Sequence, residues 1–547
     1  MLPEEAATVA DRKPEFTRVQ MHRRSKAAAR PTLIVMTMAL ILVAIFYLWR
    51  LWLLQTVAIN RDEFEHLHAA FLISQGLIPY RDFWEHHTPG FWFMLVPLYR
   101  WYPVERNPDA AVAFIFMARR ASMVFAGVCL ALTFVLARMW GGGRVAWIAA
   151  ALLSTCVAFM YKTLEVRPDV PATALWLGYL ATTFAAFGAI AARKQSSLFA
   201  LSGLLLGGAL MCTQKILVAL PALVLAMLWY LVAGEGRHLR RLANCLWQVA
   251  GFCVPILAMV AFFEAHGALR AFVYSNLATN LKWRSGLPFP GALPWVFHQN
   301  TMLVSLGIVG VLLEAWRRLR DRAFTRDKFL LLATLGAIAG LVELPEAWPQ
   351  YYLSFMPLLA IYAAGVLNSA VDKALELASA QPNSALPQYL GAGTLALVLL
   401  ALSVSPGLEM RSLFAAWTDT RQLSQLRWVI LHSSPTDTVL DCWSGLGVFR
   451  PNAYFYSMLY GQVLSTSERE RLAADLMSGR MAPKLVFPSH DLLKWVSPNA
   501  RAALLKNYMT VPGEGFIFSR ITSEEQLQTL PPEASSARSA RSAGGPK

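Results

Sequence analysis

Ionisable side chains concentrate in one short stretch that follows the first long apolar run of the chain. It begins with Asn60-Arg-Asp-Glu-Phe-Glu-His-Leu-His68, and residues 75–90 continue it with Glu85-His-His-Thr-Pro89. Carboxylates and imidazoles at this density can accept protons, bind cations or orient polar substrates. The stretch therefore predicts a reaction centre, and the adjacent acids Asp62 and Glu63 are its first candidates.

A helix over residues 62–74 would carry an apolar face and a polar face. The apolar face holds Phe64, Leu67, Phe71 and Leu72, and the polar face holds Asp62, Glu65, His66 and Ala69. We expect this helix to lie flat at the bilayer surface, where a lipid headgroup and an aqueous acceptor meet. Two alternatives stay open: the charges only solvate an interfacial helix, or His66 and His68 bind a divalent cation. The second is weakened because imidazoles two residues apart on a helix point away from each other.

A second acidic element reads Glu165-Val-Arg-Pro-Asp169-Val-Pro171. Its prolines fit a loop that leads into the first turn of a helix. Taken alone, Asp169 is a common helix-start charge. The membrane topology predicted from the spans places Asp169 on the same side of the membrane as Asp62. A role in the reaction centre is therefore as well supported as a helix-start charge.

The composition requires that a membrane positions these groups. Of 547 residues, 56% are hydrophobic and 15% are charged, whereas soluble domains carry about 25% charged residues. The net charge of +15 is spread as short basic clusters between apolar runs, so nucleic acid is not a predicted partner. The six cysteines lie mostly in or beside apolar segments and imply no disulfide framework. We therefore predict a mainly α, polytopic transmembrane helical bundle.

About eleven apolar runs are long enough to cross the bilayer, with twelve or thirteen spans as the alternative. They cover residues 32–53, 112–138, 145–161, 171–192, 198–212, 214–233, 246–264, 299–315, 329–344, 351–370 and 389–406. The run Phe91 to Tyr102 is too short and is broken by Pro97, so it is predicted to be re-entrant or juxtamembrane.

Basic residues orient this arrangement. With eleven spans, the loops on the side of the amino terminus hold 21 Lys and Arg residues and the opposite loops hold 10. The positive-inside rule then predicts a cytoplasmic amino terminus and an external carboxyl-terminal region. We expect a multi-pass protein of the bacterial inner (plasma) membrane with a periplasmic carboxyl-terminal domain.

Four regions follow from this pattern. Residues 1–31 form a basic cytoplasmic segment, and 32–406 form the transmembrane domain with the external loop 54–111. Residues 407–530 are predicted to be a small α/β domain, because three strand-like segments surround a helix-like stretch. The strands are Thr438 to Trp443, Pro483 to Pro488 and Gly515 to Ser519, and the helix is Ser467 to Met477. Residues 531–547 are predicted to be a disordered tail.

The order of these motifs resembles the C-type glycosyltransferase superfamily, specifically its branch of protein O-mannosyltransferases, aminoarabinose lipid A transferases and galacturonosyl- and related bacterial transferases. The resemblance runs from Ala58 to about Gly365. It rests on Asp62-Glu63, Gly76 to Pro79 with Tyr80-Arg-Asp82, His86-His-Thr-Pro89, Ala118-Arg-Arg120, Asp169 and Tyr351-Tyr-Leu-Ser-Phe-Met-Pro357. The Asp-Glu pair is its most specific element. The chain departs from the family at His87-Thr-Pro89, where many relatives have Lys-Pro-Pro or His-Pro-Pro, and at Gln350, where they often have Arg.

The resemblance implies transfer of a sugar, usually with inversion, from a polyprenyl-phosphate donor to an acceptor on the non-cytoplasmic side. Asp62 would be the general base, since an acceptor hydroxyl must lose its proton as it attacks. Glu63 and Asp169 would orient the sugar or acceptor, and Glu65, Tyr351 and Tyr352 are weaker substrate-binding candidates. The leaving lipid phosphate stays anionic and needs cations. The candidates are His86, His87, Arg81, Arg119, Arg120 and Arg167, each of which could instead pair with a membrane phospholipid.

The expected partners are a polyprenyl-phosphate sugar, a glycan, lipid or protein acceptor, and membrane lipids. No cofactor and no metal ligand is predicted, although a divalent cation is compatible with the residues. A transporter or flippase of a lipid-linked glycan is the alternative function, and a scaffold that has lost activity is another. Transporters tend to place charges at the bilayer midplane within paired repeats, whereas the acids here cluster at one interface and no internal repeat is evident.

Overall fold

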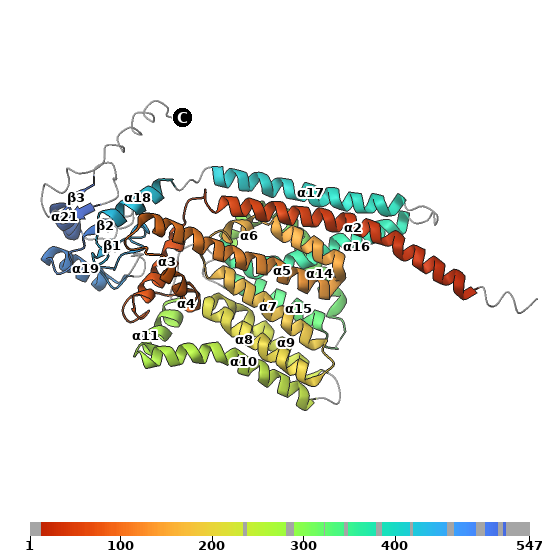
Figure 1. Cartoon of the computed structure of the whole chain (residues 1–547). Helices are drawn as coiled ribbons and strands as arrows, with labels where there is room; N and C mark the ends of the chain where they lie inside the picture. The colour runs from red at the N-terminus through yellow and green to blue at the C-terminus, as the bar shows by residue number, and fades with distance from the viewer. Residues whose placement is uncertain are drawn as a thin grey trace, which may run out of the picture.

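The computed structural model describes residues 13–233, 238–280, 289–321, 323–343, 348–378, 386–415, 420–456, 464–487, 498–511 and 518–520. Its long helices run side by side in a bundle, and a small α/β unit sits at one end (Figure 1). The amino-terminal helix α2 (Lys13–Leu53) leaves the bundle at the other end. The fold is therefore the predicted one: a mainly α membrane bundle with a carboxyl-terminal α/β domain. Of the predicted segment 1–31, residues 1–12 lie outside the described residues, and so does the whole predicted tail 531–547.

Among the described residues, seven helices are long and apolar enough to cross a membrane. They lie at Leu33–Leu53, Pro108–Ser154, Asp169–Phe187, Ala192–Cys212, Gln214–Val232, His238–Ala265 and Tyr389–Ser412. Helices α14 (Thr301–Arg318), α15 (Arg326–Glu343) and α16 (Met356–Ala378) pack in the same bundle. All eleven predicted runs thus fall on helices, while the number of crossings stays a prediction.

Helix α5 (Pro108–Ser154) contains the predicted span 112–138 and the first part of the span 145–161, and it folds back between them. Gly142 has a φ of 88°, outside the helical region, within the run Gly141-Gly-Gly143. The ring centroids of Phe134 and Trp147 lie only 4.8 Å apart. Thirteen residues of straight helix would separate them by about 20 Å. The two halves of α5 are therefore antiparallel neighbours joined at a glycine turn.

The other helices complete the bundle and its connections. Their bounds are α6 Val157–Lys162, α7 Asp169–Phe187, α8 Ala192–Cys212, η2 Gln214–Ala219, α9 Leu220–Val232, α10 His238–Ala265, α11 Leu269–Val273, η3 Tyr274–Thr279, α13 Phe289–Gln299, η4 Pro349–Ser354 and α17 Leu386–Ala415. Helices α2 and α17, red and cyan in Figure 1, run side by side along one edge.

The first long loop folds into short helices at the end of the bundle near the α/β unit. Helix α3 spans Arg61–Ser74, and α4 (Gly90–Leu95) and the 3-10 helix η1 (Val96–Trp101) follow it. The last two, of six residues each, are too short to cross a bilayer, as the sequence predicts for this run. The Tyr99 hydroxyl donates to the Leu67 carbonyl at 2.6 Å, which fixes η1 against α3.

Helix α3 is buried on both faces, which corrects the expectation of a helix lying flat on the bilayer. Glu63 to Leu72 are all buried by the rest of the protein. The alternative in which its charges only solvate an interfacial helix is therefore wrong. Residues from the distant carboxyl-terminal unit supply part of the cover, and no local sequence signal indicates such a contact.

The carboxyl-terminal unit is a four-stranded mixed sheet in the order β1-β2-β4-β3. The strands are β1 Val439–Asp441, β2 Leu485–Phe487, β3 Tyr508–Thr510 and β4 Phe518–Arg520, with β1 and β2 parallel. Helices α18 (Thr420–Leu431), α19 (Thr466–Ser478) and α21 (Pro498–Asn507) accompany it. Of the third predicted strand, only Phe518 and Ser519 lie among the described residues.

This unit docks on the first loop through polar and close contacts. His68 binds the Val448 carbonyl and the Asn452 side chain, both at 2.9 Å. Gly445, with a φ of 84°, packs so tightly against Phe64 that a Cβ would lie 2.1 Å from the ring. Only glycine fits this approach, so the α/β unit is seated directly on α3.

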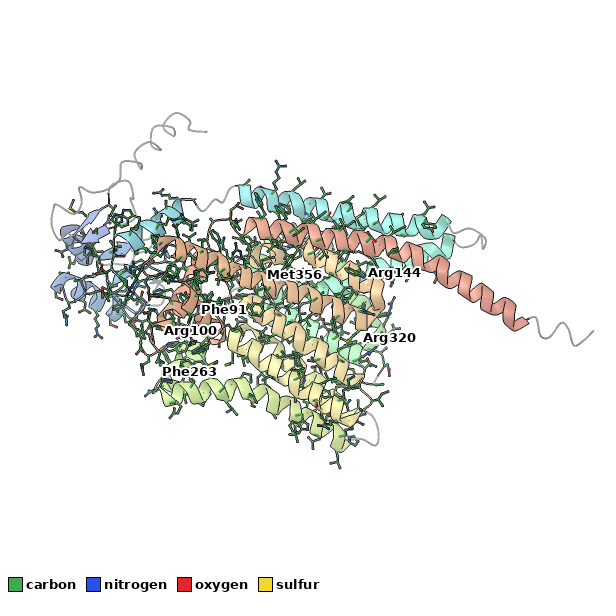
Figure 2. The ribbon with its side chains drawn as sticks, in the orientation of Figure 1. Phe91, Arg100, Arg144, Phe263, Arg320 and Met356 are labelled. Carbon is green, nitrogen blue, oxygen red and sulfur yellow. The ribbon has the colours of Figure 1, made fainter. Side chains whose placement is uncertain are left out.

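Residues from different loops lie at the two ends of the bundle. Arg144 and Arg320 lie at the end where α2 departs, whereas Arg100, Phe91 and Phe263 lie at the end with the α/β unit (Figure 2). This separation matches the predicted distribution of loops, and it places α3 at the end opposite the amino terminus. Which end faces the cytoplasm stays a prediction of the positive-inside rule.

Candidate active site

Helix α3 starts with a complete capping box that fixes the Asp62-Glu63 pair. The Asn60 side chain accepts the Asp62 backbone amide at 3.1 Å, and Glu63 Oε1 accepts the Asn60 amide at 2.9 Å. Both acids thus occupy the first helical turn, where the helix dipole stabilises negative charge. Asp62 stays accessible, with a side chain that is 31% exposed, whereas Glu63 is fully buried.

Glu63 forms a closed, buried ion pair with Arg119 of α5. Arg119 Nε and Nη2 donate to the two oxygens of Glu63 at 2.8 and 2.7 Å, and the side chains are 1% and 0% exposed. Arg119 also donates to the carbonyls of Leu54, Val57 and Ala58, in the segment that follows α2. Glu63 Oε2 accepts the Val166 amide at 3.0 Å. The pair therefore joins α2, α3, α5 and the loop before α7 behind Asp62.

Asp62 belongs to a line of alternating charges that reaches into the bundle. Arg167 Nη1 binds Asp62 Oδ2 at 2.6 Å, and Arg167 Nε lies 3.5 Å from Asp169 Oδ2. Lys215 Nζ binds Asp169 Oδ1 at 2.8 Å. The structure therefore brings together the two acidic elements that the sequence separates by more than a hundred residues.

Glu165 and Lys162 widen the same network. Glu165 Oε2 accepts a second bond from Arg167 Nη1 at 2.9 Å, and its Oε1 accepts Lys162 Nζ at 2.8 Å. Asn60 Nδ2 donates to Glu165 Oε1 at 3.1 Å. With Asp62 and Asp169, the network holds three carboxylates and three cations, so its charges balance before any substrate binds.

These charges keep Asp62 ionised. Burial would raise its pKa, but the attraction of Arg167 and the hydrogen bond between them outweigh burial and hold the pKa below its usual value. For Arg167, burial lowers the pKa, and the surrounding carboxylates, Asp62 first, raise it well above the usual value. At neutral pH the pair is therefore a carboxylate and a guanidinium.

A pocket opens beside Lys215 and Asp169, between α7, η2, α15 and η4. Its polar walls include Thr213, Gln350 and Ser354, and Asp169 and Tyr351 also line it. The ammonium of Lys215 sits 4.1 Å above the centre of the Tyr351 ring, a cation–π contact. Tyr351, a weaker candidate from the sequence, is thus part of this site. Its neighbour Tyr352 is 1% exposed and packs against Phe355 instead.

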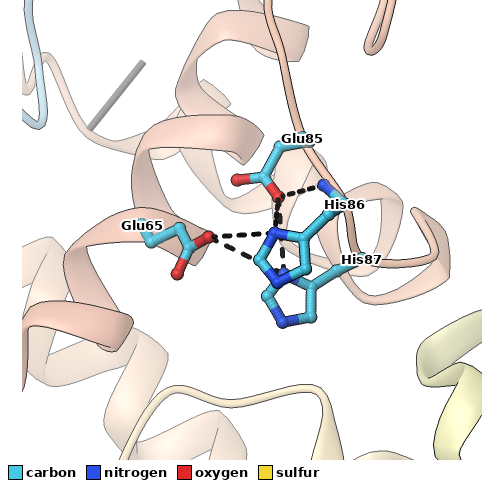
Figure 3. Close-up of side chains that lie close together, drawn as sticks. All are labelled: Glu65, Glu85, His86 and His87. Atoms are coloured by element: carbon cyan, nitrogen blue, oxygen red, sulfur yellow. Dashed lines mark hydrogen bonds and ion pairs between the residues drawn. The ribbon is translucent and has the colours of Figure 1, made fainter. Parts of the chain in front are cut away.

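Glu65, Glu85, His86 and His87 form a second group beside the charged network (Figure 3). His87 Nδ1 lies 3.4 Å from Glu85 Oε2 and 3.7 Å from Glu65 Oε1. Burial raises the pKa of Glu65 well above its usual value and raises that of Glu85 to about 7. Burial lowers the pKa of His86, and it lowers that of His87 to about 3, so both rings are neutral.

The remaining predicted site residues lie apart from these groups. Arg81 is 45% exposed, pairs with Asp82 at 2.8 Å and donates to the His266 carbonyl at 3.0 Å. Arg120 is exposed on the face of α5 away from Glu63. His66 accepts from Trp92 Nε1 at 3.3 Å, while His68 binds the α/β unit, so these two imidazoles do not converge on one cation.

Sequence reasoning missed Lys215, Glu165, Lys162 and Glu85 as site residues. Lys215 is a lone charge between two apolar runs on the side predicted to hold Asp62, which is a usable signal. Lys162 and Glu165 are close in sequence to Arg167, in the element already singled out. Glu85 directly precedes the His86-His87 pair, but nothing local indicates that it faces Glu65 on α3.

Comparison with known proteins places the fold. No family model matches the chain, and no curated protein matches it. Among solved structures, it is similar to ArnT from Cupriavidus metallidurans bound to undecaprenyl phosphate, with a TM-score of 0.60 and 12% identity over 88% of this chain and 97% of that one. The chain has the membrane fold of the C-type glycosyltransferases. The resemblance seen in the sequence is thus confirmed as a fold.

A second similarity comes from archaea. The apo oligosaccharyltransferase of Archaeoglobus fulgidus superposes with a TM-score of 0.55 and 14% identity, over 89% of this chain and 75% of that one. The Archaeoglobus fulgidus oligosaccharyltransferase AglB, in complex with an inhibitory peptide and a dolichol-phosphate, gives a TM-score of 0.50 and 14% identity, over 90% and 75%. The C-type fold therefore covers most of this chain.

Proposed function

We propose that this protein is an integral-membrane glycosyltransferase that moves a sugar from a polyprenyl-phosphate donor to an acceptor hydroxyl. The observation that carries the proposal is the line Asp62, Arg167, Asp169 and Lys215 at one end of a C-type bundle. The solved neighbours ArnT and AglB bind undecaprenyl phosphate and dolichol-phosphate, respectively, which supports a donor of this class. The acceptor is a glycan, lipid or protein on the non-cytoplasmic side.

Asp62 acts as the general base. The acceptor hydroxyl gives its proton to the Asp62 carboxylate as its oxygen forms a bond to the anomeric carbon. The bond from that carbon to the phosphate oxygen breaks, and the lipid phosphate leaves with the electron pair. A base must be ionised and reachable, and Asp62 is both, since Arg167 lowers its pKa and its side chain is 31% exposed.

Arg167 and Lys215 stabilise the leaving phosphate. In the balanced network each cation already has carboxylate partners, so a bound phosphate shares them. When Arg167 turns part of its charge toward the phosphate, its hold on Asp62 weakens and the pKa of Asp62 rises. Donor binding would thereby strengthen the base at the moment it is needed.

The other candidates take supporting roles in this proposal. Both oxygens of Glu63 and all three nitrogens of Arg119 have buried protein partners, so the pair positions Asp62 and contacts no substrate. Asp169 orients Lys215, and Tyr351 forms a wall of the pocket. Arg81 and Arg120, which are exposed, are better placed for membrane phospholipids than for the reacting phosphate.

The test is to incubate the purified protein with a panel of polyprenyl-phosphate sugars and to measure release of free lipid phosphate. Asp62→Asn should slow release by about 10²–10⁴-fold, while Asp109→Asn should not slow it. Asp109 is a matched control because it also starts a helix and pairs with an arginine, Arg427, yet is 84% exposed. Equal release by both variants refutes the proposal. Passage of a lipid-linked glycan across vesicles without release would instead identify a flippase.

A further inference from the structure

The group Glu65, Glu85, His86 and His87 has the composition of a metal site. It offers two carboxylate oxygens and two imidazole nitrogens, and these atoms all lie within 4.8 Å of one another. The four side chains are between 3% and 15% exposed. Figure 3 shows both imidazole rings directed toward the two carboxylates, which come from α3 and from the loop before α4.

The separations fit four ligands around one small cation. Each histidine Nδ1 lies 3.4 to 3.9 Å from the two carboxylate oxygens. Ligands at about 2.0–2.1 Å from a tetrahedral zinc ion lie about 3.3–3.4 Å from each other. The shortest of the four contacts, from His87 Nδ1 to Glu85 Oε2 at 3.4 Å, is a hydrogen bond, and the other three are longer, at 3.7 to 3.9 Å. Small side-chain rotations would close the group around an ion.

We propose that Glu65, Glu85, His86 and His87 together bind one divalent cation of the zinc type beside the active centre. Neutral imidazole nitrogen suits zinc, whereas magnesium and calcium prefer sites made of oxygen only. The two carboxylates balance the charge of the ion. Four protein ligands leave no open position, so the ion holds structure and does not itself contact the sugar.

The backbone that carries the two histidines is already fixed from three directions. The His86 carbonyl accepts Gln214 Nε2 at 3.0 Å and Asn280 Nδ2 at 2.7 Å, and the His87 carbonyl accepts the Tyr80 hydroxyl at 2.6 Å. Tyr80 itself has a φ of 68°, a strained value for a residue with a side chain. These contacts hold the backbone of the histidine loop and so limit the positions that the two rings can take.

The position of the proposed ion indicates a structural role next to Asp62. Glu65 follows Asp62 by three residues and therefore lies on the same side of α3, nearly one turn away. An ion bound there ties α3 to the histidine loop and fixes the direction of the helix that carries Asp62. It also adds positive charge close to the region where the anionic phosphate is proposed to bind.

Metal content tests the site without any assay of transfer. We would dialyse the purified protein against micromolar Zn²⁺, remove unbound ions by gel filtration and measure zinc per chain by mass spectrometry. The wild type should retain about one zinc ion per chain, and His87→Ala and Glu65→Gln should each weaken retention by at least about tenfold. His266→Ala is the matched control, because His266 is exposed and lies outside the group.

A loss of folding must be separated from a loss of the site. The variants should elute as the wild type does in gel filtration, and without zinc their unfolding temperatures should match that of zinc-free wild type. Zinc should then raise the unfolding temperature of the wild type and of His266→Ala only. Retention of zinc by His87→Ala and Glu65→Gln at the wild-type level overturns the proposal, as does a wild type that binds no zinc. Neither result depends on whether the protein transfers sugar.

Discussion

The buried pair of Glu63 and Arg119 allows a sharp distinction between a residue that positions the base and a residue that reacts. Glu63→Gln keeps the size of the side chain and removes its charge. Arg119 would then be left as a cation with 1% exposure and without its carboxylate partner. Breaking a buried pair in this way typically costs about 3–5 kcal/mol, because the remaining charge is uncompensated.

The structure places this cost at the upper part of that range. Glu63 accepts four hydrogen bonds, two from Arg119 and one each from the Asn60 and Val166 amides. A glutamine has one oxygen in place of two, so it cannot accept all four bonds. The capping box and the attachment of the loop before α7 are therefore weakened together with the ion pair.

Thermal unfolding in detergent measures this loss for Glu63→Gln, for Arg119→Gln and for the double variant. Each single variant should unfold well below the wild type, and the double variant should be less destabilised than the sum, because it leaves no lone buried charge. At low temperature, where Glu63→Gln is still folded, its KM for the donor should stay near that of the wild type. A variant of normal stability with a strongly raised KM would refute the positioning role and make Glu63 a substrate contact.

Four further predictions concern the charged network itself. Asp62→Asn should lower kcat by about 10²–10⁴-fold in a transfer assay. Its unfolding temperature, measured by calorimetry, should stay within about 2 °C of that of the wild type. An unchanged kcat would exclude Asp62 as the base. In Arg167→Met, burial still raises the pKa of Asp62, and the attraction of Arg167 that lowered it is gone. The rate should therefore begin to fall at a higher pH than in the wild type as the solution is acidified. An identical pH–rate profile would contradict the pairing of Asp62 with Arg167. In the wild type, the lowered pKa of Asp62 means that its pair with Arg167 contributes its full share of the free energy of unfolding above about pH 4. This contribution should be lost only as the pH falls further. Acid unfolding monitored by circular dichroism can check this. Lys215→Met should lower kcat/KM for the donor by at least about tenfold, and an unchanged kcat/KM would place Lys215 outside the phosphate site.

Local patterns were sufficient to predict the elements that carry the site. The spacing of apolar and polar residues fitted a helix at 62–74, and α3 begins one residue earlier, at Arg61. The predicted spans 112–138 and 145–161 required a turn between them, and Gly142 makes it. Capping, periodicity and breakers act over a few residues, so one sequence contains them in full.

Contacts between distant segments could not be predicted in the same way. The sequence offers Arg119 and Arg120 as equals, but one helical step of about 100° separates a buried partner of Glu63 from an exposed residue. The cover of α3 by residues near Gly445 depends on how the α/β unit docks, nearly four hundred residues later. Likewise, Glu85 and Glu65 meet only because the loop before α4 returns to α3.

The place of the donor phosphate tests the account most directly. An experimental structure with a bound polyprenyl phosphate would show it, and the account predicts phosphate oxygens at hydrogen-bonding distance, about 3 Å, from Arg167 or Lys215. The anomeric position next to that phosphate should then face the Asp62 carboxylate. A phosphate seated on the exposed Arg81 or Arg120, with the Asp62–Arg167 pair undisturbed, would contradict it.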